Sequence, residues 1–149
     1  MSEHHASLHW ERGEAPFTYE AYSRDHQVVF GEGTRITASS AKEYRGTANL
    51  ANPEEMLVGA ASSCHMLTFL AICAREKITV DRYEDRATGW LEKDAHRRLS
   101  ITRIVLRPSV VFAERMRIDT ARLASLHHRA HDGCFIASSI RAAVTVDTN

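Results

Sequence analysis

The sequence has little cysteine and no net charge, and both absences narrow the range of functions. Its 3 cysteines are too few for a disulfide-stabilised scaffold, and an odd number leaves one thiol unpaired. This usage suits a reducing compartment, and the N-terminus has no cationic stretch followed by an apolar run, so we expect a cytoplasmic protein without a signal peptide. Lys and Arg total 19, as do Asp and Glu, so no overall field attracts a polyanion and nucleic acid is not an expected partner.

Glycine and proline are also scarce, at 7 and 3 residues, which excludes a collagen-like or low-complexity chain. Hydrophobic residues make up 44% and charged residues 26%, as in a globular protein. The 149 residues suffice for one hydrophobic core but not for separate cofactor and substrate domains. We therefore predict a single domain over residues 1–149.

Strand-like segments lie on both sides of a long helical segment, which indicates an α+β fold. Alternating residues at 17–22, a polar turn and β-type residues at 28–30 predict a hairpin with Arg24 at its tip. We expect further strands within 34–38, 79–93, 99–106, 110–112 and 142–146, a helix from Asp119 or Thr120 to Gly133, and a helical turn over 134–140.

The long helix begins with a strong start signal. Asn52 is suited to the N-cap, Pro53 to the first helical position, and Glu55 can bond back to the cap. No charged residue occurs from Met56 to Ala74, a length near the ~20 residues that span a bilayer. Polar residues in mid-segment and the strand-rich remainder favour a different interpretation, a helix buried within protein on every side by a sheet or a partner subunit. We expect no membrane span.

Two cysteines are candidates for chemistry. Cys64 lies in the middle of the long helix, and Cys134 follows Gly133 at a predicted helix start, where unpaired N–H groups favour a thiolate. Taken alone, either residue is more often a small core residue than a reactive thiol. Cys73, with no polar motif around it, is the clearest case of such a core residue.

The segment from Asn52 to Met66, NPEEMLVGAASSCHM, resembles the motif that opens the central helix of the OsmC/Ohr family, the osmotically inducible and organic hydroperoxide resistance proteins. The resemblance implies an OsmC-like fold, with antiparallel sheets wrapped around a buried central helix in an intertwined homodimer. It also implies a cofactor-free thiol peroxidase with no metal, haem or flavin. Cys64 would be the peroxidatic thiolate and Cys134 the resolving thiol, while Arg24 would lie beside Cys64 and Glu54 would position Arg24.

The implied partners are a hydroperoxide substrate, chiefly an organic one, and a thiol reductant such as a dihydrolipoyl protein. Phe135 stands where the family commonly has Pro after its second Cys, and His65 after Cys64 resembles the OsmC branch. Candidates for apolar pocket walls are Phe17, Tyr22, Met66 and Phe69, although core packing is the commoner role for each.

Helix geometry gives a separate argument for the homodimer. Glu54 and Cys64 are separated by about 15 Å along one helix, so they cannot share a site within one chain. If Glu54 serves an Arg24 that touches Cys64, the carboxylate and the thiol come from different chains. Glu54 alone is also well suited to a plain role near the positive end of the helix dipole.

Two other interpretations stay open. The first is a non-peroxidatic protein of the same fold that binds or senses a small electrophile or ligand through its thiols. The second is a metal-binding protein, because His127 and His131 have the i, i+4 spacing of two ligands on a helix near Cys134. No recognised metal motif accompanies these histidines, so we expect a solvated or capping role for them.

Overall fold

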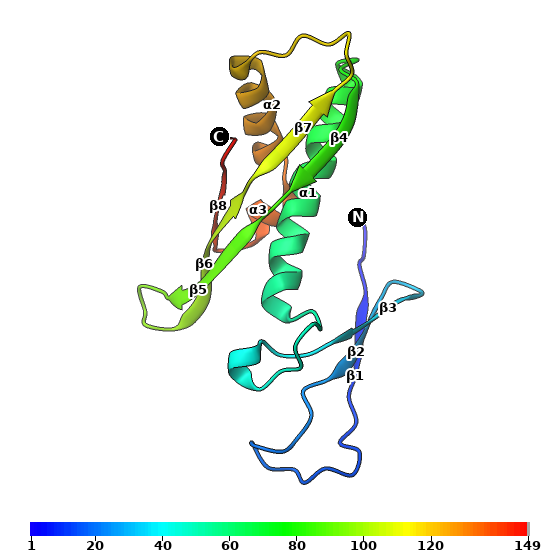
Figure 1. Cartoon of the computed structure of the whole chain (residues 1–149), viewed down its shortest axis with the longest axis vertical. Coiled ribbons are helices and arrows are strands. Elements are labelled where there is room, and N and C mark those ends of the chain that lie inside the picture. The colour runs from blue at the N-terminus through cyan, green and yellow to red at the C-terminus, as the bar shows by residue number, and fades with distance from the viewer. Residues whose placement is uncertain (149) are drawn as a thin grey trace. The chain divides into compact units, whose positions relative to one another are not determined.

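The computed structural model describes residues 1–148, which form two compact units with a boundary between Met56 and Leu57. The first unit holds an antiparallel sheet in the order β1-β2-β3, formed by Ala6–His9, His26–Phe30 and Thr34–Ala38 (Figure 1). A short 3-10 helix, η1 (Lys42–Tyr44), follows, and a parallel bridge joins Ala38 to Ala51. The predicted strand at 34–38 is confirmed.

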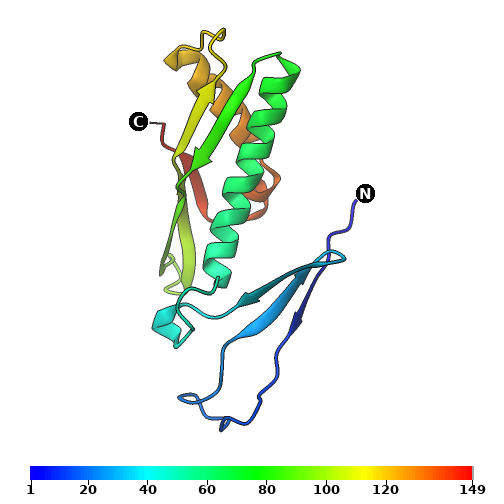
Figure 2. The same ribbon diagram turned by 45° about the vertical axis from the view of Figure 1, so that its right-hand side comes forward.

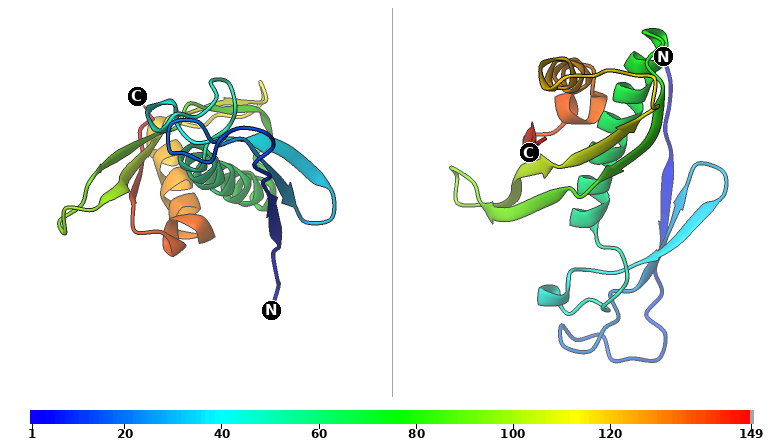
Figure 3. Two further views of the ribbon diagram at one scale, coloured as in Figure 1. Left: turned by 90° about the horizontal axis from the view of Figure 1, so that it is seen from below. Right: turned by 45° about the horizontal axis from the view of Figure 1, so that its top comes forward.

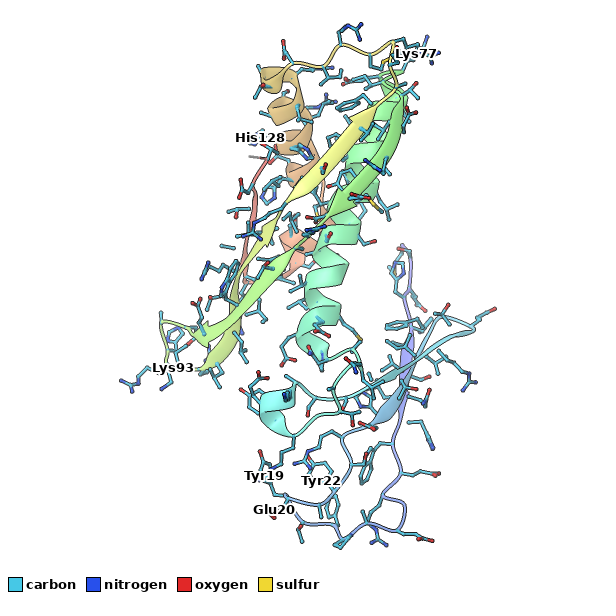
Figure 4. The ribbon with its side chains drawn as sticks, viewed as in Figure 1. Tyr19, Glu20, Tyr22, Lys77, Lys93 and His128 are labelled. Atoms are coloured by element: carbon cyan, nitrogen blue, oxygen red, sulfur yellow. The ribbon has the colours of Figure 1, made fainter. Side chains whose placement is uncertain are left out.

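Helix α1 (Pro53–Arg75) begins as the sequence predicts. The main-chain N–H of Asn52 donates to Glu55 Oε2 at 3.2 Å, and the N–H of Glu55 donates to Asn52 Oδ1 at 2.9 Å, which completes a capping box. The helix ends at Arg75, and Lys77, labelled in Figure 4, takes a left-handed conformation with φ of 60°. The N–H of Ile78 then bonds the carbonyl of Cys73 at 2.9 Å, which closes the end of the helix.

The second unit contains most of α1, two further helices and two small sheets. Strands β4 (Val80–Asp85) and β7 (Pro108–Phe112) form one antiparallel pair. The other sheet has the order β5-β6-β8, formed by Thr88–Lys93, Leu99–Leu106 and Ala143–Val146. Its β5–β6 pair is antiparallel and its β6–β8 pair is parallel, so the sheets are antiparallel except at this last strand.

The predicted strand over 79–93 is two strands, because the chain changes partners after Asp85. The Asp85 carboxylate accepts hydrogen bonds from Ser62 Oγ at 2.5 Å and from the main-chain N–H of Arg107 at 2.6 Å. These bonds hold the junction at which β4 stops pairing with β7 and β5 starts pairing with β6.

Helices α2 (Thr120–Asp132) and α3 (Phe135–Ser139) agree with the predicted boundaries. Asp119 caps α2 by accepting from the N–H of Arg122 at 2.7 Å, and Gly133 is the C-cap. Figures 1 and 2 show α2 running alongside α1, and both panels of Figure 3 show α3 following α2 on the side near α1.

Two apolar clusters fill the second unit. One joins α1 to α2 through Phe69, Ile72, Cys73, Leu126 and Ala130. The other joins α1 to the β5-β6-β8 sheet through Ala61, Ile104, Leu106 and Ala142. At Gly89 in β5, an added Cβ would lie 2.5 Å from the Val58 side chain, so the close approach of this strand to α1 requires glycine.

Within one chain, only one side of α1 is buried. Ala61, His65, Phe69, Ile72 and Cys73 are buried, whereas Leu67 is 60% exposed. The helix has the length and composition to cross a membrane, a test that the core helix of a soluble protein also passes.

Candidate functional site

The structure brings Cys64 and Cys134 together. Cys64 is half-buried in the middle of α1, and Cys134 is buried as the N-cap of α3. The Cys134 Sγ lies 4.0 Å from the carbonyl oxygen of Ala61, one helical turn before Cys64. Cys64 lies close enough to Cys134 to raise the pKa of the Cys134 thiol, and both cysteines are free.

Burial controls the acidity of Cys134. The N–H of Ala137 donates to its Sγ at 3.5 Å, as expected at a helix start. Burial nevertheless raises the pKa of Cys134 above its ordinary value, and the neighbouring Cys64 adds to this rise. The predicted helix start is therefore confirmed, while the prediction that it favours a Cys134 thiolate is wrong because burial outweighs the N–H groups. Cys73 is a buried core residue, as expected, and burial raises its pKa as well.

Arg24 lies in the connection between β1 and β2, not at the tip of the predicted hairpin. Its Nη1 donates to the Tyr22 carbonyl and its Nη2 to the Tyr19 carbonyl, each at 2.5 Å. Its guanidinium carbon lies 3.7 Å from the centroid of the Tyr22 ring. Figure 4 shows Tyr19 and Tyr22 in this connection, which contains turns where the sequence predicts a strand.

Within one chain, no ion pair joins Arg24 to Glu54 among the described residues. Glu54 Oε2 is instead buried without a hydrogen-bond partner in the described part of the chain. Such an orphaned carboxylate oxygen is costly unless another group satisfies it. The pairing of Arg24 with Glu54 stays a prediction.

An aromatic pocket of about 510 Å³ adjoins Arg24 in the first unit. Its lining includes Trp10, Phe17 and Tyr22, whose rings contact one another, with centroids 5.9 Å apart for Trp10–Phe17 and 5.5 Å for Phe17–Tyr22. Phe17 and Tyr22 thus line a pocket as the sequence suggested. Phe69 belongs to the apolar core instead, and Met66 is half-buried on α1.

A buried pair of histidines lies between α1 and α2. His65 Nε2 and His127 Nδ1 are 3.0 Å apart, and the rings are 1% and 3% exposed respectively. The His127 ring stacks on Phe69 at 4.4 Å. Burial lowers the pKa of each histidine to about 4, and Asp85 opposes this shift.

The solvated or capping role expected for His127 is therefore wrong, because its side chain is buried and bonds His65. The sequence carried a signal for its burial, because Leu123, Leu126, His127 and Ala130 have the i, i+3, i+4, i+7 spacing of a buried helix face. Within residues 1–148, no group of three or more His, Cys, Asp or Glu side chains is arranged to hold a metal ion.

Comparisons with known proteins identify the family and the fold of the chain. The family model for OsmC-like proteins matches residues 46–149. The chain belongs to the OsmC-like family. Among its relatives, the uncharacterized protein YmaD of Bacillus subtilis is 31% identical over 124 residues, which cover 82% of each chain.

Solved structures of OsmC-like proteins share the fold. An OsmC-like protein of unknown function from Vibrio cholerae, VCA0330, is 39% identical with a TM-score of 0.94, and 99% of each chain is covered. The organic hydroperoxide resistance protein OhrB of Bacillus subtilis is 15% identical with a TM-score of 0.69, covering 99% of this chain and 98% of its own. The α+β OsmC-like fold predicted from the sequence is thereby confirmed.

The hydrogen bonds that hold the Arg24 side chain could not be predicted from the sequence. Its hydrogen-bond partners are main-chain carbonyls, which every residue possesses, so no residue type marks them. The two cysteines and Asn52 were recognisable because their side chains and spacing carry the pattern.

Proposed function

We propose that the protein is a thiol peroxidase that reduces organic hydroperoxides through Cys64 and Cys134. The observation that carries this proposal is the position of the Cys134 sulfur beside α1, 4.0 Å from the Ala61 carbonyl oxygen one turn before Cys64 and close enough to Cys64 for the two thiols to influence one another. Names of structural relatives such as OhrB support it at the level of the family. Thiol chemistry of this kind needs a reducing compartment, so the proposal includes a cytoplasmic location.

The proposed cycle uses both cysteines. The Cys64 thiolate attacks the distal oxygen of the peroxide, which becomes the oxygen of a sulfenic acid, and the O–O bond breaks to release an alcohol after protonation. The Cys134 thiol then condenses with the sulfenic acid, forming a disulfide and releasing water. A raised pKa keeps the proton on the Cys134 sulfur until this condensation. An external dithiol, such as a dihydrolipoyl protein, reduces the disulfide.

A guanidinium is suited to the first step. An ordinary thiol with a pKa of ~8.5 is a few per cent ionised at neutral pH, so full ionisation gains only about thirtyfold in rate. Further acceleration requires stabilisation of the departing oxygen, for which the several N–H donors of arginine are appropriate. We assign this role to Arg24, with Glu54 as the carboxylate that positions it.

The proposal includes an intertwined homodimer of this single-domain chain. The exposed side of α1 carries Ala60, Ser63, Leu67, Ala71 and Ala74 at helical spacing without a charged residue. A helix face in contact with water normally carries charged residues, so a second copy of the chain is the expected cover for this face. The second copy would also bring Glu54, at the start of its own α1, to Cys64 in the middle of α1 of the first copy.

Mass spectrometry after one equivalent of cumene hydroperoxide tests the proposed cycle. We expect the intact chain to lose two hydrogens through a Cys64–Cys134 disulfide. In Cys134→Ser, this loss should be replaced by the gain of one or more oxygen atoms at Cys64. Cys73→Ser is the matched control and should behave like the unaltered protein.

An unreactive Cys64 would reject the peroxidase and favour the non-peroxidatic protein that binds or senses a small electrophile. Retention of zinc through gel filtration would favour the metal-binding interpretation instead.

A further inference from the structure

The buried pair of histidines lies next to the proposed reaction centre but takes no part in the proposed cycle. His65 follows Cys64 on α1, and His127 reaches it from α2 with the 3.0 Å contact between Nε2 and Nδ1. Each ring nitrogen on the far side, His65 Nδ1 and His127 Nε2, is buried without a partner among the described residues. This contact is a directional polar contact within the apolar part of the helix interface. Two more polar contacts lie at the end of α1, where Arg122 and Arg129 of α2 donate to the Glu76 carboxylate.

The end of α2 connects this contact to Cys134. The N–H of Cys134 donates to the His131 carbonyl at 3.1 Å, which ties its backbone to the last turn of α2. At Gly133, an added Cβ would lie 3.0 Å from Thr68 Cγ2, so α2 approaches α1 closely at this point. A small shift of α2 along α1 would therefore move the Cys134 sulfur relative to Cys64.

Apolar contacts cannot fix such a shift alone. Hydrophobic contact is non-directional, so Leu126 and Ala130 hold α2 against α1 without setting its position along the axis. A hydrogen bond depends on distance and angle, so position along the axis is set by the polar contacts. The bonds to Glu76 act at the end of α1, and the bond between the histidines acts beside Cys64. Satisfied polar contacts inside a core specify one arrangement even where their net contribution to stability is modest.

We propose that His65 and His127 are positioning residues that hold Cys134 against Cys64, so that the sulfenic acid is captured as a disulfide. This inference rests on the proposed peroxidase function. The competing reaction is attack of the Cys64 sulfenate on a second hydroperoxide, which gives a sulfinic acid and one more alcohol. Misplacement of reacting atoms by about 1 Å can slow a reaction by about 10²-fold, so the two products report the position of Cys134.

A matched pair of variants separates positioning from polarity. In His127→Asn, the side-chain amide occupies the place of Nδ1 and retains the bond to His65, whereas in His127→Gln it occupies the place of Nε2 and does not. We expect His127→Gln to form the disulfide about 10- to 100-fold more slowly and to accumulate sulfinic acid at Cys64 under excess cumene hydroperoxide. His127→Asn should stay close to the unaltered protein.

Two controls address stability and surface effects. Leu126→Ala removes a buried side chain of the same helix without touching the histidines, and His128→Gln changes an exposed neighbour, labelled in Figure 4. Quenched-flow mass spectrometry measures disulfide and sulfinic acid, while thermal unfolding measures the loss of stability. His65→Leu tests the same bond from α1 if His127→Gln does not fold.

The inference is overturned if His127→Gln forms the disulfide at the rate of the unaltered protein. It is also overturned if Leu126→Ala, with the same Tm as His127→Gln, slows disulfide formation by the same factor. A third result that overturns it is a rate of disulfide formation in His127→Asn as low as that in His127→Gln. If the unaltered protein itself forms no Cys64–Cys134 disulfide, the proposed function fails, which is a separate and distinguishable result.

Discussion

At the scale of the residue, Arg24 is held by main-chain acceptors and an aromatic ring. Two hydrogen bonds to the carbonyls of Tyr19 and Tyr22 orient the plane of the guanidinium, and the Tyr22 ring covers one of its faces. A lysine keeps the charge but has one compact ammonium group, which cannot make this two-point contact and still present further N–H donors.

We expect Arg24→Lys to lower kcat/KM for cumene hydroperoxide by about 10²- to 10³-fold, the usual cost of losing a donor to a developing negative charge. Arg35→Lys, at an exposed position of β3 in the same unit of the chain, is the matched control and should have little effect. Stopped-flow kinetics measure both variants. Equal activity of Arg24→Lys and the unaltered protein would show that Arg24 does not act on the peroxide.

The residues of the proposed site were recognisable in the sequence only where their side chains carry the chemistry. Cys64 and Cys134 could be singled out by type and setting, and the structure places them as neighbours that influence one another's ionisation. The environment of Cys134 could not be predicted, because its acidity depends on burial by residues distant in the sequence.

At the scale of the element, the histidine pair makes the packing of α2 on α1 dependent on pH. In the unfolded chain a histidine binds its proton near pH 6.5, but burial lowers the pKa of His65 and His127 to about 4. Between these values the unfolded chain binds more protons, so stability is fully present above about pH 6.5 and is lost as the pH falls toward 4.

We expect the free energy of unfolding to fall by at least on the order of 3 kcal/mol over this interval, which is the value for one of the two histidines. Urea unfolding between pH 7 and pH 4 measures it. The double variant His65→Gln, His127→Asn should reduce the dependence on pH, whereas His128→Asn, at an exposed position, should leave it unchanged. A double variant with the same acid sensitivity as the unaltered protein would contradict this prediction.

Helices and strands were predictable from the sequence where the capping residues and the alternation of apolar and polar residues agree with the tertiary structure. The capping residues of α1 and α2 and the β6 strand follow from short-range patterns, and the structure confirms them. The connection between β1 and β2 was not predictable, because its alternating residues imitate a strand. In the structure, Phe17 and Tyr22 line the aromatic pocket instead, and the N–H of Tyr22 bonds the carbonyl of Thr18 at 3.1 Å.

At the scale of the whole molecule, one chain alone cannot complete the proposed site. Glu54 and Cys64 lie on the same helix, separated by about 15 Å of rise, and the Glu54 carboxylate has a buried oxygen without a partner in the described part of the chain. The proposed homodimer resolves both observations by pairing the carboxylate of each copy with the thiol of the other.

Complementation between two inactive variants tests this arrangement. Cys64→Ser lacks the thiol and Glu54→Gln lacks the carboxylate, so each homodimer should be inactive or strongly impaired. Co-expression with two different affinity tags allows mixed dimers to be purified. If each site takes its thiol from one copy and its carboxylate from the other, a mixed dimer has one intact site and about half of the unaltered activity, because the two sites of a symmetric dimer are equivalent. If both groups came from the same copy, neither site would be intact, and the mixed dimer would be no more active than its Glu54→Gln parent.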